Sequence, residues 1–178
     1  MKRYILAAAL GLSILTSVTV SAEQSSLDDL FERLQRTQST TYALRVTNSI
    51  WRIWNTPPDP DQAMKVDAFH QALGRRNLKL ARQLADGLID AAPEYAEAWN
   101  KRAIVFFELG MYDRSLEDID KVLSLEPRHF GAMSGRAHIH LARDELSSAY
   151  RWFSKALKVN PHLQDAKRFV ESLGGSEA

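Results

Sequence analysis

Apolar residues in the C-terminal two thirds of the chain recur at helical spacing, in pairs of short amphipathic segments separated by polar turns. Pro93, Pro127 and Pro161 follow one another at intervals of 34 residues. A period of this length is typical of stacked helix–turn–helix hairpins. The pattern therefore predicts an all-α fold with three repeats, over residues 62–95, 96–129 and 130–163.

Small residues mark the position in each repeat where the second helix must approach the first closely. That position holds Ala81, Ser115 and Ala149. Gly110 is expected to end the first helix of the central repeat in a left-handed conformation. Asn77 and Asp144 lie near the equivalent turns and tolerate that conformation next best.

The repeats are flanked by further predicted helices. Residues 23–61 contain two apolar stripes and then a proline-rich linker, and this hairpin could be a degenerate fourth repeat. Trp51 and Trp54 could stack on a ligand, but their helical spacing favours core packing against the next repeat. Residues 164–178 are predicted to form a C-terminal capping helix with one polar face, followed by a short tail.

The N-terminus has the pattern of a secretory signal peptide. Lys2 and Arg3 precede an apolar run over residues 5–15, and small residues end the segment at Ala22. The apolar run is shorter than the roughly 20 residues that span a bilayer, which disfavours the alternative of a retained membrane anchor. We expect residues 1–22 to be removed and the mature protein, beginning at Glu23, to be soluble and periplasmic.

Charge and composition exclude several function classes. The formal net charge is +1, and removal of Lys2 and Arg3 leaves 21 basic against 22 acidic residues, so a nucleic-acid surface is not expected. The chain has no cysteine, which excludes disulfides and thiol chemistry. His138 and His140 lie two apart on a predicted helix and point in different directions, so they do not form a metal pair. No catalytic motif occurs, and we predict a non-enzymatic protein without cofactor or metal.

The order of residue types in the central repeat identifies a family resemblance. It runs through Trp99, Ala103, Phe106, the Gly110–Tyr112 turn, Ser115, Ile119, Val122 and Pro127. With its 34-residue period, this order resembles the tetratricopeptide repeat (TPR), and the whole chain resembles exported bacterial periplasmic TPR proteins. The resemblance implies a right-handed superhelical solenoid that binds a protein or peptide partner on its concave surface.

The resemblance also implies which side chains line that concave surface. Among them are His70, Glu97, Asn100, Ile104, Phe107 and His138. This mixed set suits a peptide or helix with an apolar anchor and some backbone hydrogen bonding. An equally open alternative is that Ile104 and Phe107 complete the packing between repeats. The donor residues of TPR domains that hold a chaperone's C-terminal carboxylate are mostly missing, so a clamp of that kind is not expected.

Arg102 and Arg136 occupy a position that is usually apolar in the family. Each could contact an acidic partner, or each could be structural, with its head group on a carboxylate such as Asp118 or Asp120. The structural role is favoured because burying an unpaired guanidinium group is costly.

Three functions remain after these exclusions. The first is a periplasmic adaptor that binds protein and supports assembly or integrity of the cell envelope. The second is a chaperone or quality-control factor that holds exported clients. The third is a carbohydrate binder or a cofactor-free enzyme built on the aromatic residues. The sequence predicts no oligomeric state.

Overall fold

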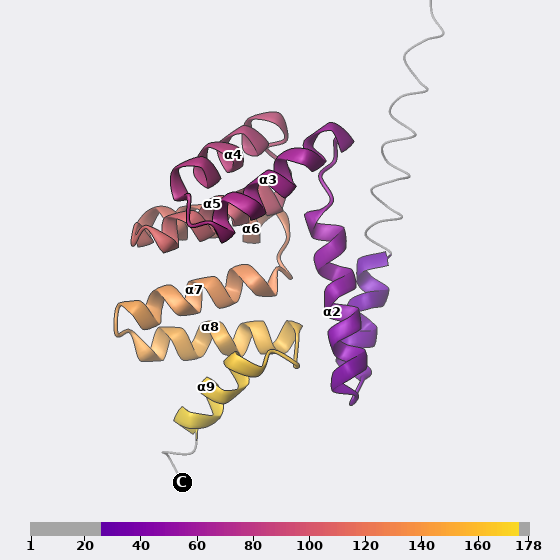
Figure 1. Cartoon of the computed structure of the whole chain (residues 1–178). Coiled ribbons are helices and arrows are strands. Elements are labelled where there is room, and N and C mark those ends of the chain that lie inside the picture. The colour runs from indigo at the N-terminus through magenta and orange to yellow at the C-terminus, as the bar shows by residue number, and fades with distance from the viewer. Residues whose placement is uncertain (1–25, 175–178) are drawn as a thin grey trace, which may run out of the picture. The chain divides into compact units, whose positions relative to one another are not determined.

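The computed structural model describes residues 26–174, and their regular secondary structure is helical (Figure 1). The predicted signal peptide and the last four residues lie outside this range. The chain divides into two compact units, Met1–Ile53 and Trp54–Ala178.

The described part of the first unit is a pair of helices. Residues 26–36 form the first, and α2 spans Thr40–Asn55, with its final two residues in the second unit. The Ser39 hydroxyl accepts a hydrogen bond from the Tyr42 amide at 3.3 Å and so caps the first turn of α2. The predicted apolar stripes are buried at Leu27, Phe31, Leu34, Ala43, Val46 and Ile50.

The second unit is a stack of helical hairpins. Its helices are η1 (Pro60–Gln62), α3 (Ala63–Gly74), α4 (Leu78–Ala91), α5 (Ala96–Glu108), α6 (Tyr112–Leu125), α7 (Phe130–Ala142), α8 (Leu146–Val159) and α9 (Gln164–Gly174). α3 packs on α4, α5 on α6 and α7 on α8, and α9 covers α8 (Figure 1). The predicted all-α solenoid of hairpins with a capping helix is confirmed.

Close helix contacts hold each hairpin together. Ala81, Ser115 and Ala149 are all buried, and the Ser115 hydroxyl donates to the Ala103 carbonyl of the facing helix at 2.8 Å. A larger side chain would separate the helices, because protein interiors are close-packed. The small residue predicted from the sequence spacing is therefore buried in all three hairpins.

The three inter-helix turns share a left-handed residue. Gly110 has φ 71°, Asp144 has φ 58° and Arg76 has φ 55°. The residue in the first hairpin is thus Arg76, whereas the sequence suggested Asn77. Asn77 instead caps α4, because its side-chain oxygen accepts from the Leu80 amide at 3.2 Å.

The apolar core runs from one hairpin into the next. One buried cluster joins α5, α6 and α7 through residues such as Ala103, Ile119 and Ile139. Another joins α7, α8 and α9 through Ala137, Phe153 and Ala166. Because each hairpin buries its apolar face against a neighbour, the first helices α3, α5 and α7 are held in consecutive positions, where their remaining faces form the candidate surface.

Candidate partner-binding surface

The six predicted surface residues lie on the first helix of each hairpin, as the repeat register requires. His70 is on α3, Glu97, Asn100, Ile104 and Phe107 are on α5, and His138 is on α7. The structure divides them into two groups. His70, Ile104 and His138 are exposed and Phe107 is half-buried, whereas Glu97 and Asn100 are buried. Their contact with a partner stays a prediction.

The exposed group combines an apolar side chain with two imidazole rings. Ile104 keeps 37% of its surface exposed. His138 donates from Nδ1 to the Ser134 carbonyl at 2.8 Å, which orients its ring on α7. Burial, and secondarily the charge of Lys101, lower the pKa of His70 below its ordinary value. The lowered pKa favours the neutral form of the His70 ring at neutral pH.

The half-buried Phe107 side chain packs against its neighbours and is also partly exposed on the candidate surface. Its ring lies 5.7 Å from that of Tyr112 and packs against the buried cluster shared by α5, α6 and α7. The alternative that Phe107 completes packing between repeats is thus supported by its contacts. Ile104, three residues earlier on the same helix, is the more accessible apolar side chain.

The buried group belongs to a hydrogen-bonded set of four residues, which we call the buried polar cluster: Glu97, Asn100, Lys101 and His129. Glu97 is its centre. One carboxylate oxygen accepts from the Lys101 ammonium at 3.2 Å, and the other accepts from the Asn100 amide and from His129 Nε2, both at 3.0 Å. Three donors therefore converge on one carboxylate that is only 3% exposed.

The hydrogen bonds of His129 fix its tautomer. His129 is fully buried, and its Nδ1 accepts from the Ala132 amide at 3.0 Å, which caps α7. An accepting Nδ1 places the proton of the neutral ring on Nε2, which then donates to Glu97. Burial alone would raise the pKa of Glu97, but the bond from His129 and the charge of Lys101 outweigh it and lower the pKa. The cluster therefore holds an ionised carboxylate.

Trp54 and Asn55 complete the surroundings of this cluster within the second unit. The Trp54 ring stacks on His129 with centroids 4.2 Å apart and planes 13° apart. Lys101 donates to the Asn55 side-chain oxygen at 2.6 Å. Trp54 is only 7% exposed, so it packs in the core and offers no open face to a sugar.

Sequence reasoning identified Glu97 and Asn100 but missed the partners that bury them. Neither Lys101 nor His129 is among the residues that the family resemblance places on the surface. His129 ends its repeat at the position equivalent to Tyr95 and Leu163, and a polar ring at a position otherwise filled by larger apolar side chains was the available signal.

Arg102 and Arg136 are structural, which confirms the favoured interpretation. Arg102 donates from Nε and Nη2 to both oxygens of Asp118, at 2.9 and 2.8 Å, and from Nη1 to Asp86 at 3.1 Å. Bonds to Asp118 are the largest influence on Arg102, and they raise its pKa despite burial. Arg136 pairs with Asp120 and lies over the Trp152 ring at 4.6 Å.

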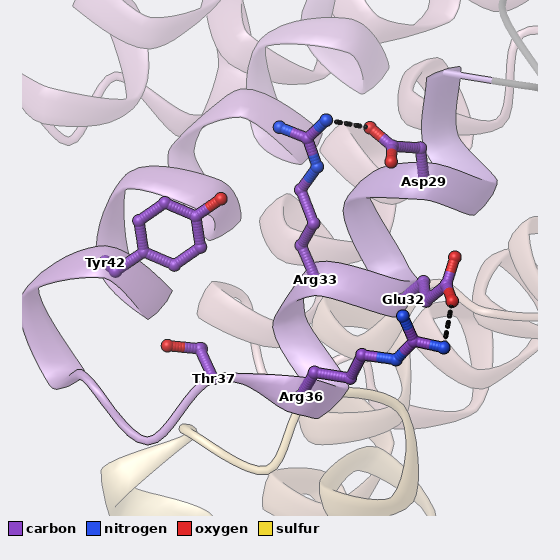
Figure 2. Close-up of a pocket in the computed structure, with 6 residues that line it drawn as sticks. All are labelled: Asp29, Glu32, Arg33, Arg36, Thr37 and Tyr42. Atoms are coloured by element: carbon purple, nitrogen blue, oxygen red, sulfur yellow. Dashed lines mark ion pairs between the residues drawn. The ribbon is translucent and has the colours of Figure 1, made fainter.

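A surface pocket of about 390 Å³ lies in the first unit (Figure 2). It is lined by Asp29, Glu32, Arg33, Arg36, Thr37 and Tyr42. Arg33 pairs with Asp29 at 2.8 Å, and Arg36 pairs with Glu32 one helical turn further on. Because each guanidinium group already faces a carboxylate, the pocket has no excess positive charge with which to hold an anion.

Two further properties bear on chemistry. Among residues 26–174, no three His, Asp or Glu side chains are grouped as metal ligands would be. His138 and His140 have separate partners, the Ser134 carbonyl and Glu145, as their helical spacing predicted. None of the helices in that part of the chain has the length and apolar character needed to cross a membrane.

Comparison with known proteins assigns the family. Residues 96–129, the predicted central repeat, match the family model described as tetratricopeptide repeat. A TPR repeat-containing protein of Rhizobium etli is 36% identical over 155 residues, which cover 86% of this chain and 75% of that protein. The chain therefore belongs to the TPR family.

Two further similarities each cover more than half of this chain. DnaJ homolog subfamily C member 3 of Mus musculus is 36% identical over 110 residues, 58% of this chain but only 22% of that protein. The first TPR of Spaghetti (RPAP3), solved bound to an HSP90 peptide, superposes with a TM-score of 0.59 at 16% identity, over 65% of this chain and 91% of that one. TPR domains mediate protein–protein interactions, and TPR proteins are typically non-catalytic scaffolds.

Proposed function

We propose that this protein is a non-catalytic periplasmic adaptor that binds a protein or peptide partner on the surface lined by α3, α5 and α7. Its role would be to support assembly or integrity of the cell envelope. The observation that carries the binding proposal is the exposed Ile104 side chain on α5, the central first helix. An exposed branched apolar side chain on a first helix is a suitable anchor point for a peptide or helix.

Crosslinking in the native host tests the binding surface. A photoreactive amino acid placed at Ile104 should capture one or a few discrete proteins. The matched control is the same probe at Leu80, an exposed apolar residue on the second helix α4. Adducts specific to Ile104 would support the proposal, and identical adducts from both positions would contradict it.

The proposed compartment rests on the N-terminal sequence. Lys2, Arg3, the apolar run over residues 5–15 and the small residues before Glu23 support export with cleavage after Ala22. N-terminal sequencing of protein recovered from the native host should give Glu23 as the first residue. Recovery of the full-length chain from the cytoplasm or from membranes would reverse the proposal.

A second candidate is a chaperone that holds exported clients. It is favoured by the similarity of part of this chain to a protein named as a DnaJ homolog. The same crosslinking experiment separates the two functions. A holdase should give many unfolded clients in variable amounts, whereas an adaptor should give a small set of partners in fixed stoichiometry.

A further inference from the structure

The buried polar cluster is not something that the repeat needs in order to pack. Glu97 and Lys101 correspond to Gly131 and Gly135 in the next repeat, and the same fold forms there without either charge. Burying a carboxylate and an ammonium group costs several kcal/mol per ion before pairing, on the order expected for such groups in proteins. Apolar residues would serve packing alone at lower cost, so the cluster calls for another role.

The contacts of Trp54 and Asn55 indicate that role. Both residues lie outside the repeats, yet each contacts one polar group of the cluster. The Asn55 oxygen accepts from Lys101, which lies 46 residues further along the chain, at 2.6 Å, and the Trp54 ring stacks on His129 at 4.2 Å. An aromatic ring on an imidazole and a carbonyl oxygen on an ammonium group are contacts of the kind by which proteins recognise peptide side chains.

These residues are also connected to the repeats by a short, stiff segment. Asn55 ends α2, and Pro57, Pro58 and Pro60 follow before α3 begins at Ala63. A short connection gives the tethered side chains a high effective concentration at the cluster, because it limits how far they can move away. A second molecule with the same chemistry must compete against it.

We propose that the buried polar cluster is a binding site whose internal ligand is the chain's own Trp54–Asn55 pair. An external protein partner displaces this pair by presenting an aromatic side chain followed directly by a residue with a side-chain carbonyl. This inference deepens the proposed adaptor function and rests on it, since it defines the partner's chemistry and adds control of access. Partner binding at Glu97 and Asn100 then requires release of Trp54 and Asn55.

A peptide added in trans tests the proposal. The probe is a fluorescein-labelled synthetic peptide of residues 46–56, VTNSIWRIWNT, and its binding to the full chain is measured by fluorescence anisotropy. The double variant Trp54→Ala/Asn55→Ala should bind the peptide at least tenfold more tightly than the unaltered chain does. Equal affinity for the two proteins, or no binding to a cooperatively folded double variant, overturns the proposal.

Matched controls keep the result specific to the cluster. Asn48→Ala removes the same type of side chain from an exposed position of α2 and should leave peptide affinity unchanged. A peptide with Ala in place of its last Trp and Asn should fail to bind, and equal binding by that peptide overturns the proposal. If the double variant does not fold cooperatively, Asn55→Ala alone decides, with a several-fold gain expected and an unchanged affinity overturning the idea.

The outcome is separable from that of the adaptor proposal. Capture of host partners from Ile104 at the same level in the unaltered chain and in Asn55→Ala would retain the adaptor and reject displacement. If the Trp54→Ala/Asn55→Ala variant binds the peptide but Ile104 captures no specific partner in the host, the internal-ligand proposal stands and the adaptor proposal is rejected.

Discussion

Replacing Glu97 with Gln tests how strongly the buried polar cluster stabilises the fold. The carboxylate accepts three hydrogen bonds, one from Lys101 on one oxygen and two on the other. A Gln amide has only one oxygen, so its NH₂ group must face at least one of these donors. The substitution also leaves the fully buried Lys101 ammonium without a counter-charge. Removing one partner of a buried ion pair costs about 3–5 kcal/mol.

The assay is urea unfolding near neutral pH, followed by far-UV circular dichroism. Glu117→Gln, the same substitution at an exposed position of α6, is the control and should change the free energy of unfolding by less than about 0.5 kcal/mol. The double variant Glu97→Gln/Lys101→Met should recover at least half of the loss, because it removes the uncompensated ammonium group. A single-variant cost no larger than that of the control would refute the reasoning.

The pH dependence of the free energy of unfolding independently tests whether the ionised Glu97 carboxylate stabilises the fold. The pKa of Glu97 in the folded chain lies below its ordinary value of 4.5. Above pH 4.5 the carboxylate is ionised in both states, and its full stabilising contribution is present. As the pH falls below that value, the unfolded chain binds a proton first, so the contribution is progressively lost. The stability gap between the unaltered chain and Glu97→Gln should therefore narrow on acidification.

Two further predictions concern the hairpins. Ser115→Leu should overpack α5 and α6 and lower the free energy of unfolding by about 1–3 kcal/mol. Glu117→Gln is again the control, and equal effects of the two substitutions would contradict the predicted repeat register. Gly110→Ala should cost about 1–2 kcal/mol through its left-handed φ of 71° alone, since no atom lies within 4 Å of the added methyl group. Gly74→Ala, which also has open space but lies in helix α3, should be neutral or stabilising in the same urea titration.

Local sequence signals were sufficient for the fold because each repeat is defined by nearby residues. The proline period and the small residues at Ala81, Ser115 and Ala149 located the hairpins before any contact was known. The pairing of Arg102 with Asp118 also followed from a simple argument, the cost of burying a guanidinium group without a carboxylate.

The candidate site was less predictable because it depends on contacts distant in sequence. The family resemblance predicts Glu97 and Asn100 on the concave surface, yet both are buried here. Their burial follows from His129, from Lys101 and from Asn55, a residue 46 positions before that lysine. No local period connects such residues. The sequence also did not predict that Arg76, and not Asn77, adopts the left-handed conformation. The reason is different: the Asn77 side chain caps helix α4.

The arginine ion pairs also affect how cooperatively the repeats unfold. Arg102 on α5 bonds to Asp118 in its own hairpin and to Asp86 in the preceding one, while Arg136 on α7 reaches back to Asp120. Each guanidinium group therefore couples a hairpin to its neighbour, in addition to the apolar contacts between them. In a linear array, strong coupling between neighbours suppresses partly unfolded intermediates. Heat applied to the three hairpins should therefore melt them in one transition, because losing one hairpin removes both an ion pair and the apolar contacts that it makes with its neighbour.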